Sequence, residues 1–73
     1  MHMRNECKID NDIYWKVIYS AYEVTIIARN LHTGRTKVCE YECDYNYRDG
    51  YQGDDILEIY RIVDEFVEVL RNE

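Results

Sequence analysis

The sequence predicts an α+β fold, in which a small antiparallel three-stranded β-meander carries one C-terminal amphipathic helix packed on one face (β-β-β-α). Two observations lead to this prediction. Apolar residues alternate along segments 22–29 and 37–45, as they do in strands with one buried face. From residue 56 onward they recur every three or four positions, which is the spacing of an amphipathic helix. A chain of 73 residues is expected to form a single domain, 1–73, with a marginal core.

The first part of the chain gives weaker signals. Residues 1–11 are polar, and we expect them to form a flexible N-terminus with no leader peptide. Residues 13–19 fit two structures. As a strand, the odd-numbered residues form an apolar face, which a turn at Ser20-Ala21 would align with the face of the next strand. As a helix, Ile13, Val17 and Ala21 also share one side, so strand and helix both remain open here.

The clearest hairpin joins segments 22–29 and 37–45, with Gly34 as the turn residue. We expect Leu31 to pair with Thr36, which places Ile26 opposite Tyr41 and gathers the apolar residues on one face. A slip of one residue would mix acidic residues into that face, so we exclude it. The tyrosine-rich segment 44–53 is expected to be a loop.

The helix is expected to follow Gly53, with Asp54 or Asp55 as its N-cap. Its apolar stripe covers about half the circumference, whereas a helix that faces one core needs a stripe of roughly 100°. The surplus suggests that a second surface packs there. The residues that we expect to mediate self-association are Ile59, Ile62, Phe66 and Val69.

Charge is divided unevenly along the chain. Residues 40–73 contain eleven acidic and three basic residues, although the net charge of the whole chain is only −6. Such an acidic half argues against nucleic acid or an anionic membrane as a direct partner. It suits either a basic protein surface as the partner or simply a soluble, solvated surface, and both readings remain open here. Tyrosines add large apolar rings with a polar end, which suit interfaces. The residues that we expect to bind a partner are Glu40, Glu42, Asp44, Tyr47, Asp49, Tyr51, Asp54, Asp55 and Glu58.

Neither a metal site, a cofactor nor catalysis is expected. The three cysteines are an odd number, and Cys39 and Cys43 would lie about 13 Å apart on one strand, beyond the reach of a disulfide. We therefore expect reduced cysteines and a cytoplasmic protein. Ser20 is the only serine and His32 has no nearby partner in the sequence, so no nucleophile and base are paired, and we expect no enzyme.

One stretch resembles a known family. Tyr22-Glu23-Val24-Thr25-Ile26, Gly34 and Glu40-Tyr41-Glu42 are similar to the first hairpin of small phage-encoded uracil-DNA glycosylase inhibitors. Those proteins are acidic, dimerise and occupy the DNA-binding site of a host enzyme. The chain differs from them in ending with a helix, where that family ends with a strand. In size and acidity the chain is also similar in character to anti-CRISPR proteins.

Two functional hypotheses follow. In the first, a phage or mobile element encodes the protein, which acts in the cytoplasm of the bacterial host cell as a DNA mimic. It would inhibit a nucleic-acid-binding enzyme or defence complex by placing carboxylates on the basic surface of that host protein. In the second, the chain is a structural or regulatory module that self-associates through the wide apolar face of its helix. A homodimer is compatible with both hypotheses.

Overall fold

The computed structural model describes residues 4–20, 23–42 and 53–72, and it shows a four-stranded sheet with one helix. The α+β class and the C-terminal helix are confirmed, whereas the expected number of three strands was wrong. The elements in chain order are β1 (Arg4–Asp10), β2 (Ile13–Tyr19), β3 (Glu23–Asn30), β4 (Thr36–Glu42) and α1 (Gly53–Arg71).

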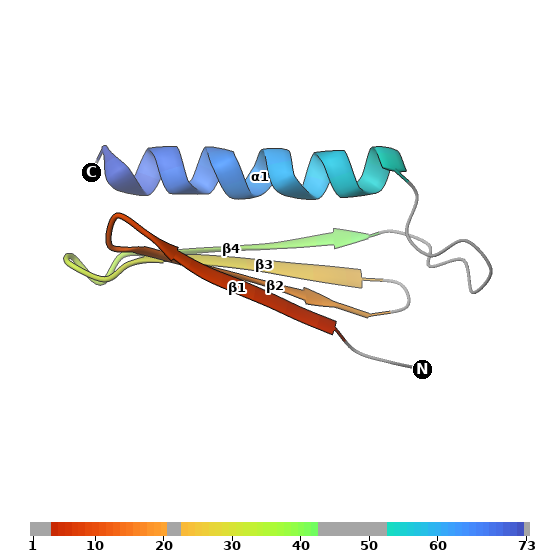
Figure 1. The fold of residues 1–73 in the computed structure, drawn as a ribbon, viewed down its shortest axis with the longest axis horizontal. Helices are drawn as coiled ribbons and strands as arrows, with labels where there is room; N and C mark the ends of the chain where they lie inside the picture. Colours follow the sequence, from red (N-terminus) through yellow and green to blue (C-terminus); the bar gives the residue numbers. More distant parts are fainter. Residues whose placement is uncertain (1–3, 21–22, 43–52, 73) are drawn as a thin grey trace.

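The strands form an antiparallel meander in the order β1-β2-β3-β4, and α1 lies along one face of this sheet (Figure 1). The helix packs mainly on β3 and less closely on β2 and β4. It reaches β1 through two polar contacts, from the Tyr60 hydroxyl to Glu6 at 2.7 Å and from Arg71 to Asp10 at 3.4 Å. The molecule therefore has two layers, and the second face of the sheet is not covered by any described element.

The additional strand, β1, occupies most of the segment that we expected to be flexible. A tight turn at Asn11 and Asp12 joins it to β2, and both residues have positive φ angles, of 48° and 68°. Asparagine and aspartate tolerate this left-handed conformation better than most residues. On the side toward α1, β1 carries Glu6 and Asp10, which bond Tyr60 and Arg71 of the helix. Because these contacts are polar, the hydrophobic alternation that marks β2 and β3 is absent from β1.

Residues 13–19 form a strand, which settles the alternative that the sequence left open. The register of both predicted hairpins differs from expectation by two residues. Ile26 pairs with Cys39 rather than Tyr41, and on its other side with Val17 rather than Trp15. A shift of two residues keeps every side chain on its own face, so the apolar pattern cannot distinguish the two registers.

The core lies between α1 and the inner face of the sheet. Its buried members are Ile13, Trp15, Val17, Tyr19, Val24, Ile26, Ala28, Ile59, Ile62, Val63, Val67 and Leu70. Burial alternates along β2 and β3, as expected for strands that show one side to a helix. Residues of β4 on this inner side are only partly buried, because the helix is centred on β3.

A buried polar side chain, Asn30, joins the β3–β4 turn to the end of the helix. Its Oδ1 accepts hydrogen bonds from the backbone N–H groups of His32 (2.8 Å) and Thr33 (3.1 Å). Its Nδ2 donates to the carbonyl oxygen of Leu70, at 3.0 Å, in the last turn of α1. Gly34 follows with a φ of 82°, a conformation that favours glycine.

Candidate interaction surface

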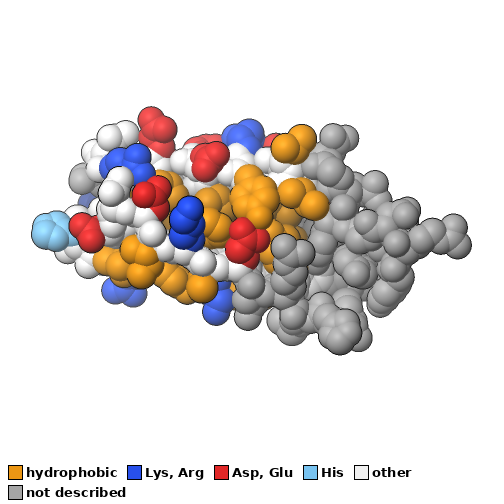
Figure 2. All heavy atoms as spheres, in the orientation of Figure 1, with side chains coloured by type: hydrophobic (Ala, Val, Ile, Leu, Met, Phe, Trp, Pro, Cys, Tyr) orange, Lys and Arg blue, Asp and Glu red, His pale blue; other side chains and the backbone are white. Residues whose placement is uncertain are grey.

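The surface that stands out is the face of the sheet away from α1, which we call the open face. Its described side chains are Cys7, Ile9, Tyr14, Lys16, Ile18, Glu23, Thr25, Ile27, Arg29, Thr36, Val38, Glu40 and Glu42. Along the lower edge of Figure 2, on the side of the sheet away from α1, hydrophobic side chains lie with Lys or Arg side chains beside them. The open face thus mixes apolar and charged groups.

Three carboxylates gather at one end of the open face, and we call Glu23, Glu40 and Glu42 the acidic end. Glu23 pairs directly with Glu42 across β3 and β4, and Glu40 follows on the same side of β4. All three side chains are exposed. Like charges directly opposite each other in a sheet destabilise it, by roughly 0.2–1 kcal/mol. No ion pair or hydrogen bond joins these carboxylates to any other side chain in the described part of the chain.

Other acidic residues that we expected to bind a partner have partners within the chain. The Tyr41 hydroxyl donates to Oδ1 of Asp55 at 2.9 Å, and Arg61 bonds Glu58 through its Nε at 2.9 Å. The remaining expected residues cannot be placed on a surface, because their side chains lie outside the described residues: Asp44, Tyr47, Asp49, Tyr51 and Asp54. Of the expected set, the structure therefore brings Glu40 and Glu42 together and adds Glu23 to them.

The outer side of α1 shows the opposite electrostatic situation. Arg61 lies between Glu58 and Glu65, and its Nη1 bonds Glu65 at 2.9 Å. The hydrogen bond from Arg61 holds the pKa of Glu58 below its ordinary value. The positive charge acts in the same direction, and partial loss of hydration acts against it. The same contacts raise the pKa of the Arg61 guanidinium. Charges on the helix are thus partly neutralised, whereas those of the acidic end are not.

The expected self-association surface on α1 is largely buried. Ile59 is 0% exposed and Ile62 is 9% exposed, and both pack against the sheet. Phe66 is partly buried, so only Val69, at 38%, is exposed to solvent among these four residues. The wide apolar stripe has a simple cause, because a helix lying across three strands buries a wider stripe than a helix facing one narrow contact. The extra width therefore reflects the sheet beneath the helix.

Sequence reasoning missed Asn30 and the apolar centre of the open face. An Asn at the end of a strand before a turn is a recognisable signal, because its side chain readily bonds backbone groups two residues on. The bond from Asn30 to Leu70 spans 40 positions, and no local pattern indicates it.

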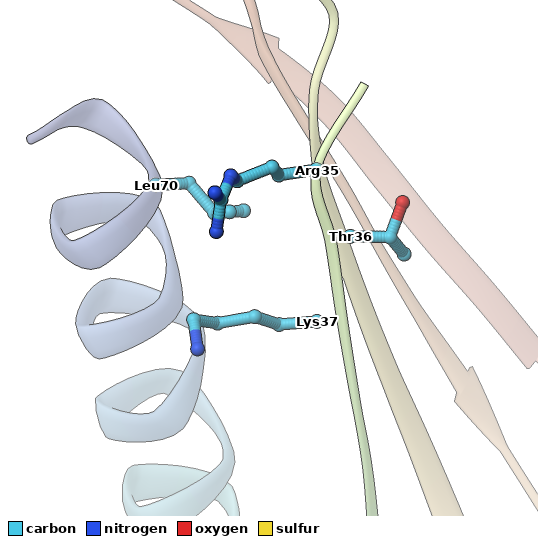
Figure 3. A pocket seen from close by; sticks show the side chains of 4 residues that line it. All are labelled: Arg35, Thr36, Lys37 and Leu70. Carbon is cyan, nitrogen blue, oxygen red and sulfur yellow. The ribbon is translucent and has the colours of Figure 1, made fainter. Parts of the chain in front are cut away.

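A shallow hollow of about 150 Å³ lies beside the end of α1 and is lined by Arg35, Thr36, Lys37 and Leu70. Figure 3 shows Arg35 and Lys37 extending toward the helix, with Leu70 reaching from the helix toward Arg35 and Thr36 pointing away. Within residues 4–20, 23–42 and 53–72, no three His, Cys, Asp or Glu side chains are placed to hold a metal ion. No described helix has the length and hydropathy needed to cross a membrane.

Comparisons with protein-family models, with curated proteins and with solved structures find no match. The function must therefore be argued from the geometry of the open face and from the charges that it carries.

Proposed function

We propose that this protein binds a basic surface of another protein through the acidic end of its open face. The observation that supports this most strongly is that Glu23, Glu40 and Glu42 are adjacent, exposed and without ion pairs in the described part of the chain. Their mutual repulsion would be relieved by Lys or Arg side chains of a partner. Complementary charge also speeds encounter between proteins, and its effect weakens with salt.

The partner that we propose is a nucleic-acid-binding enzyme or defence complex of a bacterial host cell, which the protein would inhibit. Glu40 and Glu42 lie on one side of one strand, so their carboxylates follow each other at about 6.7 Å, twice the rise per strand residue. Lys and Arg side chains that contact successive phosphates could contact this row instead. The resemblance of the hairpin to phage-encoded inhibitors supports the same partner class, and it suggests a phage or mobile-element origin.

The test is capture from a bacterial lysate by the immobilised protein, followed by mass spectrometry. Two double variants carry the same change of charge. Glu40→Lys with Glu42→Lys alters the acidic end, and Asp64→Lys with Glu68→Lys alters exposed carboxylates on α1 that form no ion pair within the described part of the chain. Each capture is repeated with added salt and with excess duplex DNA as a competitor.

The expected result is capture of nucleic-acid-binding proteins by the wild type and by the α1 variant, with a loss of at least tenfold in the acidic-end variant. Salt and duplex DNA should release the captured proteins, because both weaken contacts between carboxylates and a basic groove. If both variants capture the same proteins as the wild type, or if DNA does not compete, the proposal is wrong.

A further inference from the structure

An apolar patch occupies the centre of the open face. Ile27 pairs directly with Val38, and Ile9 pairs directly with Tyr14. Ile18 is a diagonal neighbour of Ile27 across β2 and β3, and side chains at that separation still reach each other. Ile9 is 62% exposed and Val38 is 60% exposed, although both are large hydrophobic residues. All four strands contribute to this patch, which nothing in the described chain covers.

Charges of opposite sign lie at the two ends of the patch. Arg29 lies at the end where β3 finishes, directly beside Tyr14, and the acidic end lies at the other. Lys16 lies between the two ends, directly beside Ile27. Neither Lys16 nor Arg29 has an ion-pair partner among the described residues. Arg29 and Glu23 are six residues apart on β3, which corresponds to about 20 Å, so these two side chains cannot neutralise each other within one chain.

From this arrangement we infer that the open face binds the open face of a second copy of this chain. The two sheets would pack face to face, with Ile18, Ile27 and Val38 near the centre and with Ile9 and Tyr14 farther out, at the level of Arg29. The two-fold axis would lie between the two sheets, parallel to their planes and perpendicular to the strands. Each strand then runs antiparallel to its own copy. This arrangement brings Arg29 of each copy to Glu23 of the other. The same ion pair therefore forms twice, once at each end of the dimer.

The charges also select this axis over the alternative. A two-fold axis parallel to the strands would also stack the two patches. It would, however, gather the acidic ends of both copies at one end of the dimer and both Arg29 side chains at the other. Gathering like charges in this way disfavours an interface. With the axis perpendicular to the strands, the dimer has both apolar contacts and contacts between opposite charges.

The size of the face indicates how tight the dimer is. Four strands about 4.8 Å apart and about 23 Å long present roughly 450 Å² on each copy, or about 900 Å² in the pair. Stable protein interfaces bury about 1,200–2,000 Å² in total, and weak ones bury less. The dimer is therefore in rapid equilibrium with the monomer and depends on protein concentration. Because Glu23 serves both contacts, a basic partner and the second copy compete for the acidic end.

The test is sedimentation equilibrium of the purified full chain over a range of concentrations at low salt. Wild type is expected to rise from 8.9 kDa toward twice this mass as concentration increases. Val38→Glu places a charge in the patch, and Val69→Glu makes the same change on the exposed side of α1. We expect at least a tenfold weaker dimer for Val38→Glu and an unchanged one for Val69→Glu.

A charge exchange tests the axis and uses only exposed side chains. Arg29→Glu alone and Glu23→Arg alone should each weaken the dimer, and the double variant should restore it to within about twofold of wild type, because the pair is rebuilt with its signs reversed. The inference is overturned if the wild type stays at 8.9 kDa at every concentration. It is also overturned if Val69→Glu weakens the dimer as much as Val38→Glu, or if the double variant is no better than the single ones. None of these outcomes depends on the proposed host partner.

Discussion

Asn30 shows how much of this small fold can depend on one polar side chain. It is only 7% exposed, and it satisfies two N–H groups of the hairpin turn and one carbonyl of the last helical turn. Backbone groups at helix ends lack partners within the helix, so a side chain from the sheet that bonds one of them holds the two layers in register. The amide is suited to this position because it offers both an acceptor and a donor.

We expect Asn30→Ala to lower the free energy of unfolding by about 1–3 kcal/mol, because it leaves three backbone groups without this partner. Asn30→Asp keeps the acceptor for the turn but loses the donor to Leu70. It also places a carboxylate beside the negative end of the helix dipole, so it should destabilise the protein at neutral pH as well. Urea unfolding followed by circular dichroism measures both changes.

Thr33→Ala is the matched control for this prediction. It removes a longer, exposed hydrogen bond, in which Thr33 Oγ1 accepts from the Arg35 backbone N–H at 3.3 Å. Its effect should stay below about 0.5 kcal/mol, as is usual for exposed positions. An Asn30→Asp variant as stable as the wild type would show that the bond to Leu70 contributes nothing.

At the scale of elements, the β1–β2 hairpin depends on its turn. Asn11 and Asp12 both have positive φ, which is the geometry of a two-residue turn whose twist matches that of the strands. The backbone carbonyl of Asp12 also accepts a hydrogen bond from the Leu31 N–H at 2.8 Å, so this turn supports the neighbouring one. The turn and the pairing with β2 hold β1 in the sheet, and the bonds from Tyr60 to Glu6 and from Arg71 to Asp10 join it to α1.

Asp12→Gly is expected to stabilise the protein by up to about 1 kcal/mol, because Asn-Gly is the preferred pair for such a turn. Asp12→Val should destabilise it by about 1–3 kcal/mol, since a β-branched residue is strained at positive φ. Gly34→Ala is the control in which a glycine at positive φ is replaced. The added Cβ would lie an ordinary 3.8 Å from Arg29, so any loss of stability would come from the φ of 82°. Thermal unfolding should rank Asp12→Gly above wild type and the other two variants below it.

The elements also show what could be predicted from the sequence and what could not. The strands that form the core can be recognised by their alternating apolar residues, and α1 by its apolar stripe. Burial of one face imposes these two sequence periods. β1 was not predicted because it meets the helix through the polar side chains of Glu6 and Asp10, so burial imposes no apolar alternation on it. The expected strand registers were wrong by two residues. Alternation of apolar residues shows which face of the sheet a side chain occupies, but not which residue it pairs with. Ile59 and Ile62 were misassigned to self-association because the width of the sheet beneath the helix was unknown.

At the scale of the whole molecule, the distribution of charge lowers the stability of the fold. The chain carries a net charge of −6, and Glu23 opposite Glu42 adds a local repulsion on an exposed face. On the outer side of α1, Arg61 shows that the fold accommodates a cation between acidic residues. Retaining unpaired carboxylates at the acidic end is understandable if that surface is used in binding, since functional surfaces are often less stable than they could be.

Glu42→Lys should therefore make the isolated protein more stable while it weakens binding of a basic partner. Replacing one of two facing carboxylates with a cation turns a repulsive cross-strand pair into an attractive one, and we expect a gain of about 0.5–1 kcal/mol at low salt. Glu40→Lys makes the same change of charge on the same face, but opposite Thr25, so its gain should be smaller. In about 1 M salt, where the Debye length is near 3 Å, both gains should shrink. Equal gains for the two variants in urea unfolding would show that only net charge matters. A larger gain for Glu42→Lys that salt removes would instead locate the repulsion at the Glu23–Glu42 pair, where a basic partner would relieve it.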